Sequence, residues 1–86
     1  MGDMEMYTVR LKPRAQKELA GLAEETRRRI VSALQKLESG LMGDVKHLTD
    51  FTPEYRLRVG DYRVLFEIEG RSVIVYRVCP RKDAYH

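Results

Sequence analysis

The sequence contains one cysteine and no long hydrophobic run, and each of these shortages excludes a class of protein. Because Cys79 is the only cysteine, the chain can form neither an internal disulfide nor a cysteine-rich zinc cluster. No apolar stretch approaches the roughly 20 residues that a membrane helix needs. Residues 1–6 carry acids where a signal peptide carries basic residues. We therefore expect a soluble, cytoplasmic protein without a membrane partner.

The chain is also short, which limits it to one hydrophobic core. Its 86 residues leave no room for a second domain of ordinary size. A chain of this length buries only roughly 60–65% of its unfolded surface, so its stability is marginal without help from a partner. We expect an irregular N-terminal extension at residues 1–5 and a single domain at residues 6–86.

Basic residues outnumber acidic residues by 16 to 13, and the excess lies near the C-terminus. The segment 55–86 holds six arginines and one lysine against four acids. A net charge of +3 is compatible with a polyanionic partner but does not specify one.

The spacing of apolar residues predicts a strand, two helices and then three strands. Residues 7–12 alternate between apolar and polar side chains, as a half-buried strand does. Apolar residues then recur at helical spacing in two segments, of which the first begins at Pro13. The predicted helices span residues 13–21 and 24–39, the later strands span residues 55–59, 62–68 and 72–79, and residues 41–54 form a connecting loop.

This order of elements predicts an α+β domain. A helix hairpin packs on one face of a four-stranded, largely antiparallel sheet in the order β-α-α-β-β-β. Residues 27–29 are three consecutive arginines in the second helix. Glu24 and Glu25 lie four residues before Arg28 and Arg29, so we interpret these arginines as solvent-exposed members of ion pairs.

Alternation along the strands places other arginines on the sheet face that points away from the helices. A two-residue turn at residues 60–61 pairs Arg58 with Arg63 across the strands. A three-residue loop at residues 69–71 would pair Arg63 with Arg77. The prediction is a row of three arginines.

Like charges directly across a sheet destabilise it, and Glu67 is the only acid in this row. The planar donors of arginine match phosphate oxygens, and several of them can stabilise the charge that develops on a phosphorus centre. The row therefore predicts an anion-binding surface, although an ordinary solvated sheet face stays an alternative.

The end of the chain adds further candidate groups. Arg81 follows Pro80 after the last strand, and Tyr85 and His86 place two side chains capable of proton transfer at the terminus. The alternative is that these residues belong to a disordered tail.

Two segments resemble a known family. The run YRLRVGDYRVLF at residues 55–66 and the ending PRKDAY at residues 80–85 strongly resemble the RelE-type toxins of the RelE/ParE superfamily, which belong to type II toxin–antitoxin systems. The resemblance extends from about Met6 to the end, and the helix hairpin is only generically similar. It implies a RelE-like fold.

The resemblance also implies an activity and partners. The implied activity is that of an endoribonuclease that inhibits translation by cleaving messenger RNA, typically in the ribosomal A site. The ribose 2′-hydroxyl attacks the adjacent phosphate, and no metal or other cofactor is implied. The implied partners are messenger RNA, the ribosome and a cognate antitoxin protein.

By position, the resemblance gives catalytic roles to Arg58, Arg63, Arg81 and Tyr85. Arg63 and Arg81 would hold and neutralise the phosphate with the assistance of Arg58. Tyr85 would orient the nucleotide by stacking or would transfer a proton. The further RNA-binding candidates are Arg56, Arg77, Lys82, His86 and Lys46.

The chain departs from the family pattern at several positions. Family members often have lysine where this chain has Arg56 and Arg58, and arginine is too basic to serve readily as a general base. Cys79 and Pro80 replace the residues that many members place before the arginine. The general base stays unassigned, and its candidates are Glu54, Asp61, Lys82, Tyr85 and His86.

Two other functions stay open. The ParE-like branch shares the fold but is associated with inhibition of DNA gyrase, a binding function without catalysis. A catalytically inactive RNA-binding relative is the other alternative. The convergence of arginines favours the nuclease, because an inhibitor does not need to gather positive charge around one phosphate.

Overall fold

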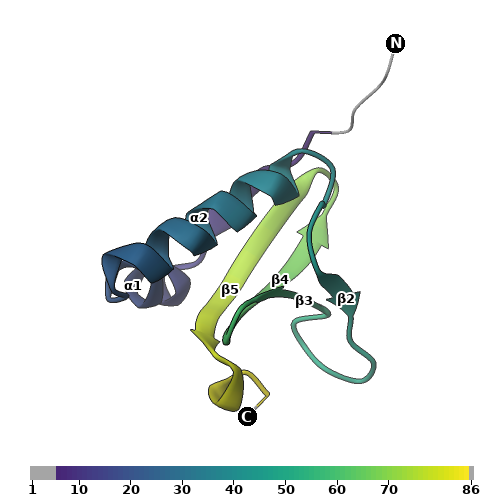
Figure 1. Ribbon diagram of the computed structural model, residues 1–86. Helices are drawn as coiled ribbons and strands as arrows, with labels where there is room; N and C mark the ends of the chain where they lie inside the picture. The colour runs from purple at the N-terminus through teal and green to yellow at the C-terminus, as the bar shows by residue number, and fades with distance from the viewer. Residues whose placement is uncertain (1–5, 86) are drawn as a thin grey trace.

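Two helices pack against one face of a five-stranded sheet in residues 6–85, the part of the chain that the computed structural model describes (Figure 1). The elements in chain order are β1 (Thr8–Leu11), α1 (Pro13–Ala20), α2 (Glu24–Glu38), β2 (Val45–His47), β3 (Tyr55–Val59), β4 (Tyr62–Glu69), β5 (Ser72–Pro80) and a 3₁₀ turn, η1 (Arg81–Asp83). The predicted α+β helix-on-sheet fold is confirmed. The extension predicted at residues 1–5 and the site candidate His86 lie outside the described residues.

The sheet has one strand more than the sequence predicted. Its order is β1-β5-β4-β3-β2, and β1 runs parallel to β5 while the other pairs are antiparallel. The additional strand is β2, which pairs with β3 inside the segment predicted as a loop. Three residues are too few to show a strand period in the sequence, so the prediction of four strands was wrong.

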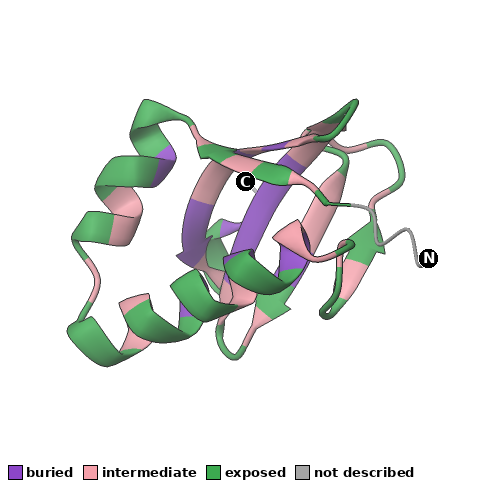
Figure 2. Ribbon diagram, turned by 90° about the horizontal axis from the view of Figure 1, so that it is seen from above, coloured by how far each residue is buried: buried purple, intermediate pink, exposed green. Residues whose placement is uncertain are grey.

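The main core lies between the helices and the sheet. Ile30, Leu34 and Leu37 form the buried stripe of α2, and each contributes roughly 1.5–3 kcal/mol by leaving water. They pack against the sheet around Phe66, which is fully buried. Figure 2 shows buried residues in the middle of the sheet and exposed residues along the outer sides of the helices. In the described residues, no helix is long and apolar enough to cross a membrane.

The β3–β4 turn has the predicted register. Gly60 adopts a φ of 59°, a left-handed conformation that glycine accepts without steric cost. The turn pairs Val59 with Tyr62 and therefore Arg58 with Arg63. This part of the predicted arginine row is confirmed.

The β4–β5 register differs from the prediction. Gly70 has a φ of 61°, and Glu69 pairs with Ser72, so the turn contains two residues in place of the predicted three. A β-bulge then inserts Tyr76 between two pairs of the ladder. Arg63 consequently lies opposite Cys79. The predicted row of three arginines was wrong.

The displaced Arg77 lies opposite Leu65 and takes part in covering the free edge of β5. Strand β1 ends at Leu11, before it reaches that part of β5. The Glu18 carboxylate of α1 accepts the Val78 backbone N–H at 2.8 Å and the Arg77 Nε–H at 2.9 Å. A side chain thus replaces the missing neighbouring strand.

The sheet face opposite the helices has a small hydrophobic cluster of its own. Leu65, Cys79 and Ala84 are buried in it, and Phe51 packs against it from the β2–β3 loop. Ala84 is only 1% exposed, so it anchors the segment that follows β5. For residues 81–84, the alternative of a disordered tail was therefore wrong.

Candidate functional site

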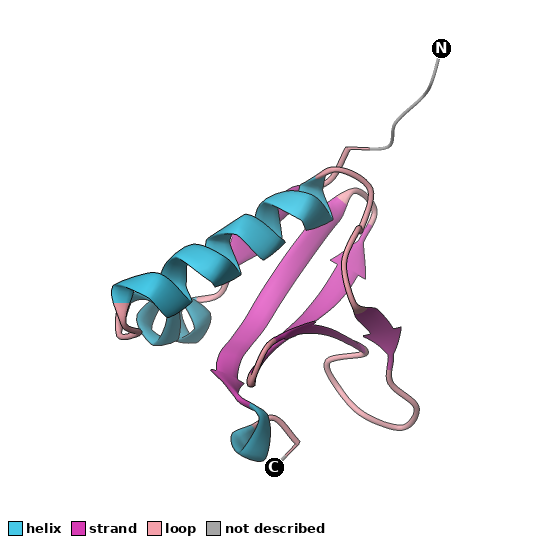
Figure 3. Ribbon diagram, viewed as in Figure 1, coloured by secondary structure: helices cyan, strands magenta, loops and turns pink. Residues whose placement is uncertain are grey.

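Several predicted site residues meet at one end of the sheet. The Arg81 backbone N–H donates to the Asp61 carbonyl oxygen at 2.8 Å, which ties the end of β5 to the β3–β4 turn. Figure 3 shows the short coil of η1 directly after β5. A hollow of about 540 Å³ opens here. It is lined by Asp61, Pro80, Arg81, Lys82 and Tyr85, and we call it the terminal hollow.

Arg63 supports the turn beside this hollow and is 7% exposed. Its Nη1 donates to the carbonyl oxygens of Gly60 and Tyr62, both at 3.0 Å. No carboxylate of the described residues forms an ion pair with it. The edge formed by its Nε and Nη2 likewise has no hydrogen-bond partner there. Arg63 is therefore a nearly buried cation whose unpaired edge still reaches solvent, because no buried side-chain nitrogen or oxygen of the described residues lacks a hydrogen-bond partner. This is the edge with which arginine binds phosphate oxygens in pairs.

The two basic residues of η1 are exposed and also lack partners. The side chains of Arg81 and Lys82 make no hydrogen bond or ion pair within residues 6–85. Among the described residues, Asp61 is the only acid that lines the terminal hollow. The balance of charge around the hollow is therefore positive, which suits an anionic ligand.

Tyr85 is held over the terminal hollow by an aromatic contact. Its ring lies edge-on to that of Phe51, with 5.5 Å between the ring centroids. Phe51 is itself fixed in the small cluster, and Tyr85 stays 44% exposed. An exposed ring on a fixed support can stack on a nucleobase.

Three of the five candidate general bases line the terminal hollow. These three are Asp61, Lys82 and Tyr85. Glu54 does not line it, and its Oε1 lies 3.8 Å from His47 Nε2. Among the described residues, Asp61 is the one carboxylate that lines this hollow, which makes it the carboxylate candidate for the base.

Four other predicted site residues do not line the terminal hollow. Arg56 binds Asp44 through its carbonyl oxygen at 3.0 Å and its carboxylate at 3.3 Å. Lys46 lies opposite Arg56 on β2, and Arg77 is paired with Glu18. Their assignment to RNA binding stays a prediction. Arg58 pairs with Arg63 across the strands but does not line the hollow.

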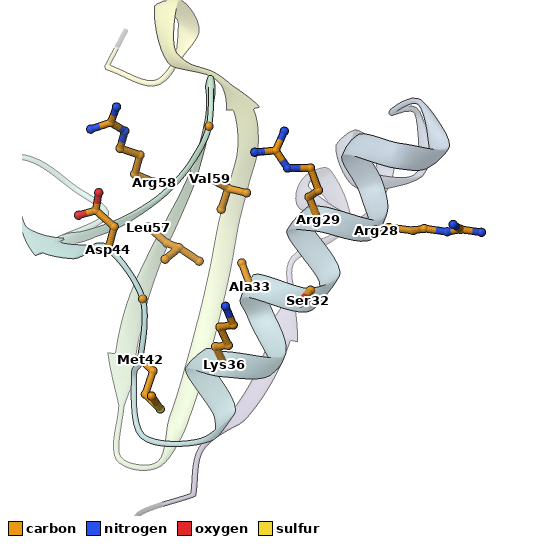
Figure 4. A pocket seen from close by; sticks show the side chains of 12 residues that line it. Arg28, Arg29, Ser32, Ala33, Lys36, Met42, Asp44, Leu57, Arg58 and Val59 are labelled. Atoms are coloured by element: carbon orange, nitrogen blue, oxygen red, sulfur yellow. The ribbon is translucent and has the colours of Figure 1, made fainter.

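A separate groove of about 510 Å³ lies between α2 and β3 (Figure 4). Arg28 points away from it and forms the predicted ion pair with Glu24 at 2.8 Å. The expected pair of Glu25 with Arg29 was wrong. The Arg29 guanidinium instead lies beside Gly60, where an added Cβ would come within 3.1 Å of it.

Cys79 is a strand residue, as expected, and its thiol is buried. Burial raises the pKa of the thiol above its ordinary value of 9.0, and the nearby Arg77 charge opposes this only in part. The thiol is therefore neutral at physiological pH, which makes it a poor nucleophile.

The sequence also matches known proteins. Residues 9–85 match the family described as "ParE toxin of type II toxin-antitoxin system, parDE". The Toxin RelE3 of Methanocaldococcus jannaschii is 31% identical over 74 residues, which cover 80% of this chain and 84% of that protein.

Solved structures show the same fold. A toxin–antitoxin complex of Mycobacterium tuberculosis, RelBE2, contains a chain with a TM-score of 0.76 and 27% identity, over 88% of this chain and 99% of that one. The archaeal RelE–RelB complex of Pyrococcus horikoshii gives a TM-score of 0.75 and 26% identity, over 92% and 99%. The chain therefore belongs to the ParE toxin family, within the RelE/ParE superfamily of type II toxin–antitoxin systems.

Proposed function

We propose that this toxin is a metal-independent endoribonuclease that cleaves messenger RNA, in the ribosomal A site, and thereby inhibits translation. The observation that carries the proposal is the position of Arg63. Its buried charge and free donor edge lie beside the turn that forms one wall of the terminal hollow, and the exposed Arg81 and Lys82 form another wall. These groups gather positive charge around a space open to a single-stranded chain.

The proposed reaction is an internal displacement on RNA. The ribose 2′-oxygen forms a bond to phosphorus, and the bond from phosphorus to the 5′-oxygen of the next nucleotide breaks. The products are a 2′,3′-cyclic phosphate and a free 5′-hydroxyl. Asp61 accepts the proton of the 2′-hydroxyl, while Lys82 or Tyr85 returns a proton to the leaving oxygen. Arg63 and Arg81 stabilise the additional negative charge on the phosphate oxygens.

We further propose that a cognate antitoxin binds and neutralises the toxin. The two similar structures from Mycobacterium tuberculosis and Pyrococcus horikoshii are both toxin–antitoxin complexes, RelBE2 and RelE–RelB. A small domain of marginal stability also gains from a partner that binds only its folded form.

The test is translation-coupled cleavage of messenger RNA by the purified chain, mapped at nucleotide resolution. Arg81→Ala is the best single change, because its side chain holds no other part of the described structure. Arg63→Ala is less clean, since it also removes two hydrogen bonds from the turn. Arg28→Ala is the matched control, because it deletes an equal charge on the outer side of α2.

We expect Arg81→Ala to lower the cleavage rate by about 10²–10³-fold, as the loss of one charge-stabilising donor does in other enzymes. Arg28→Ala should cleave like the unmodified chain. Equal activity of both variants would contradict the proposed site. Products without a cyclic phosphate would contradict the reaction.

Inhibition of DNA gyrase is the second candidate function. The observation that favours it is the family match, which is to the ParE toxins. Gyrase supercoiling is therefore measured in parallel. Intact messenger RNA together with inhibited gyrase would establish the second candidate, whereas RNA binding without either effect would indicate an inactive relative.

A further inference from the structure

A second hollow of about 520 Å³ lies on the same sheet face as the small hydrophobic cluster. We call it the lateral hollow. Leu65 and Tyr76 contribute to it from β4 and β5, and Lys12 and Arg14 come from the junction of β1 and α1. Phe51 contributes from the β2–β3 loop. None of these five residues lines the terminal hollow.

The two hollows are neighbours. Phe51 lines the lateral hollow, and its ring contacts that of Tyr85, which lines the terminal hollow. Ala84 and Tyr85 are adjacent in the chain, and each lines a different one of the two. A flexible polymer that occupies the terminal hollow can therefore continue into the lateral hollow past the Phe51–Tyr85 pair.

The β-bulge supplies the lateral hollow with an aromatic ring. Tyr76 is the inserted residue of the bulge and has no partner in the β4 ladder. It is partly exposed, and the Lys12 Nζ lies over its ring, 5.4 Å from the centroid. A nucleobase that takes the place of this ammonium can stack on the ring, while the displaced Lys12 stays close enough to hold the attached phosphate.

The charge of the lateral hollow also fits a nucleotide. In the part of the chain that the structure describes, its lining includes Lys12, Arg14 and Arg77 but no acid. Glu18 pairs with Arg77 at 2.9 Å and with Arg14 at 3.7 Å. Lys12 has no ion pair within residues 6–85, so it is the cation available to a phosphate.

We propose that the lateral hollow is a nucleotide subsite for single-stranded RNA, in which a base next to the scissile phosphate stacks on Tyr76 and its phosphate binds Lys12. This inference rests on the proposed ribonuclease function. It assigns two RNA-binding residues, Lys12 and Tyr76, in addition to those of the terminal hollow.

The test measures the binding of 2′-O-methyl RNA oligonucleotides, which cannot be cleaved because the attacking hydroxyl is blocked. Fluorescence anisotropy compares a dinucleotide, which can fill one hollow, with a hexanucleotide, which can reach both. The variants are Tyr76→Ala, Tyr76→Phe and Lys12→Ala. Lys36→Ala, which removes an equal charge from the α2–β3 groove, is the matched control.

We expect Tyr76→Ala to weaken binding of the hexanucleotide roughly tenfold, which corresponds to the loss of one stacked base. Tyr76→Phe should bind normally, because the ring is retained. Lys12→Ala should lower the slope of log affinity against log salt by about one. Binding of the dinucleotide, and the behaviour of Lys36→Ala, should not change.

The outcomes separate this inference from the proposed function. Cleavage of messenger RNA by the unmodified chain, with equal hexanucleotide binding by Tyr76→Ala and Lys12→Ala, overturns the subsite and leaves the nuclease. Lack of both cleavage and RNA binding overturns both proposals. Variants that bind RNA normally but escape neutralisation by the antitoxin would assign the lateral hollow to a protein partner. If Tyr76→Ala does not fold, the RNA binding of Lys12→Ala decides whether the subsite exists, because Lys12 is exposed and its loss does not disturb the core.

Discussion

Arg63 shows how one residue can serve both the fold and the site. Two of its N–H groups hold the carbonyl oxygens of the β3–β4 turn, so the guanidinium is fixed before any ligand arrives. Burying the Arg63 charge without an acidic ion-pair partner costs free energy. The hydrogen bonds to these carbonyls offset part of this cost, and in the proposed complex a phosphate offsets more of it. Such an arrangement favours the transition state of phosphoryl transfer, because the donors need no reorganisation.

Asp61 gives the first prediction at the residue scale. Asp61→Asn keeps the shape and the backbone carbonyl that binds Arg81, but the amide cannot accept a proton. We expect messenger RNA cleavage to fall by about 10²–10⁴-fold while the hexanucleotide still binds. The measurement is the single-turnover cleavage rate as a function of pH. An unchanged rate would remove Asp61 from the role of base.

Cys79 gives a prediction about pH. The pKa of its thiol is raised above 9.0 in the folded state, so the folded form disfavours the thiolate. Stability from the neutral thiol is fully present below about pH 9 and is lost as the pH rises toward the folded pKa. We expect the urea midpoint to fall more steeply between pH 8 and about 10 in the unmodified chain than in Cys79→Ala. Parallel curves for the two proteins would count against this.

At the scale of elements, β5 is the strand on which both hollows depend. It is followed directly by η1, which contains Arg81 and Lys82, and Tyr76 is the inserted residue of its bulge. The part of β5 that β1 does not reach is covered by Glu18 of α1. The first helix therefore stabilises the edge of the strand that carries the site, although it contributes no residue to the terminal hollow.

Glu18→Ala tests this role. The change leaves the Val78 N–H without its acceptor and removes the ion pair of Arg77, so we expect unfolding to require about 1–3 kcal/mol less free energy. Glu18→Gln should lose less, since its amide oxygen can still accept the N–H. Urea denaturation measures both. Glu24→Ala is the control, because it breaks only the exposed pair with Arg28, and a similar loss there would refute the special role of Glu18.

At the scale of the whole molecule, the domain places its two helices on one face of the sheet and the C-terminal segment with Arg81 and Lys82 on the other. The C-terminal segment folds back onto the second face through Ala84, which leaves the hollows on either side of the Phe51–Tyr85 pair. A chain of 86 residues buries little surface for its size, so partner binding can add a large share of its stability.

The last prediction concerns the antitoxin. A partner present at 100 times its Kd stabilises the folded toxin by about 2.7 kcal/mol. For a domain of this size, that corresponds to a rise in melting temperature of roughly 10 °C or more. Differential scanning calorimetry of the toxin with and without its antitoxin measures it. An equal melting temperature in the two samples would contradict a partner that binds only the folded toxin.

Local patterns in the sequence determined a large part of this protein. Helical spacing identified the buried stripe of α2, because residues three and four apart share one helix face. Glycine at position 60 and strand alternation together set Arg58 opposite Arg63, since a two-residue turn fixes the register of both strands. The motifs of residues 55–66 and 80–85 indicated the family that the comparisons then showed.

Only the tertiary structure decided the rest, because the remaining features depend on contacts between distant segments. The β4–β5 turn is one residue shorter than predicted, and the bulge inserts Tyr76. Arg77 therefore lies outside the predicted arginine row and pairs with Glu18, 59 positions away. Burial of Ala84 brought the terminal residues to Asp61, and Phe51 reached Tyr85 from a loop with no regular pattern. The periodicity of apolar residues predicts which face of a helix or strand a residue occupies, whereas long-range packing determines which residues from other segments it contacts.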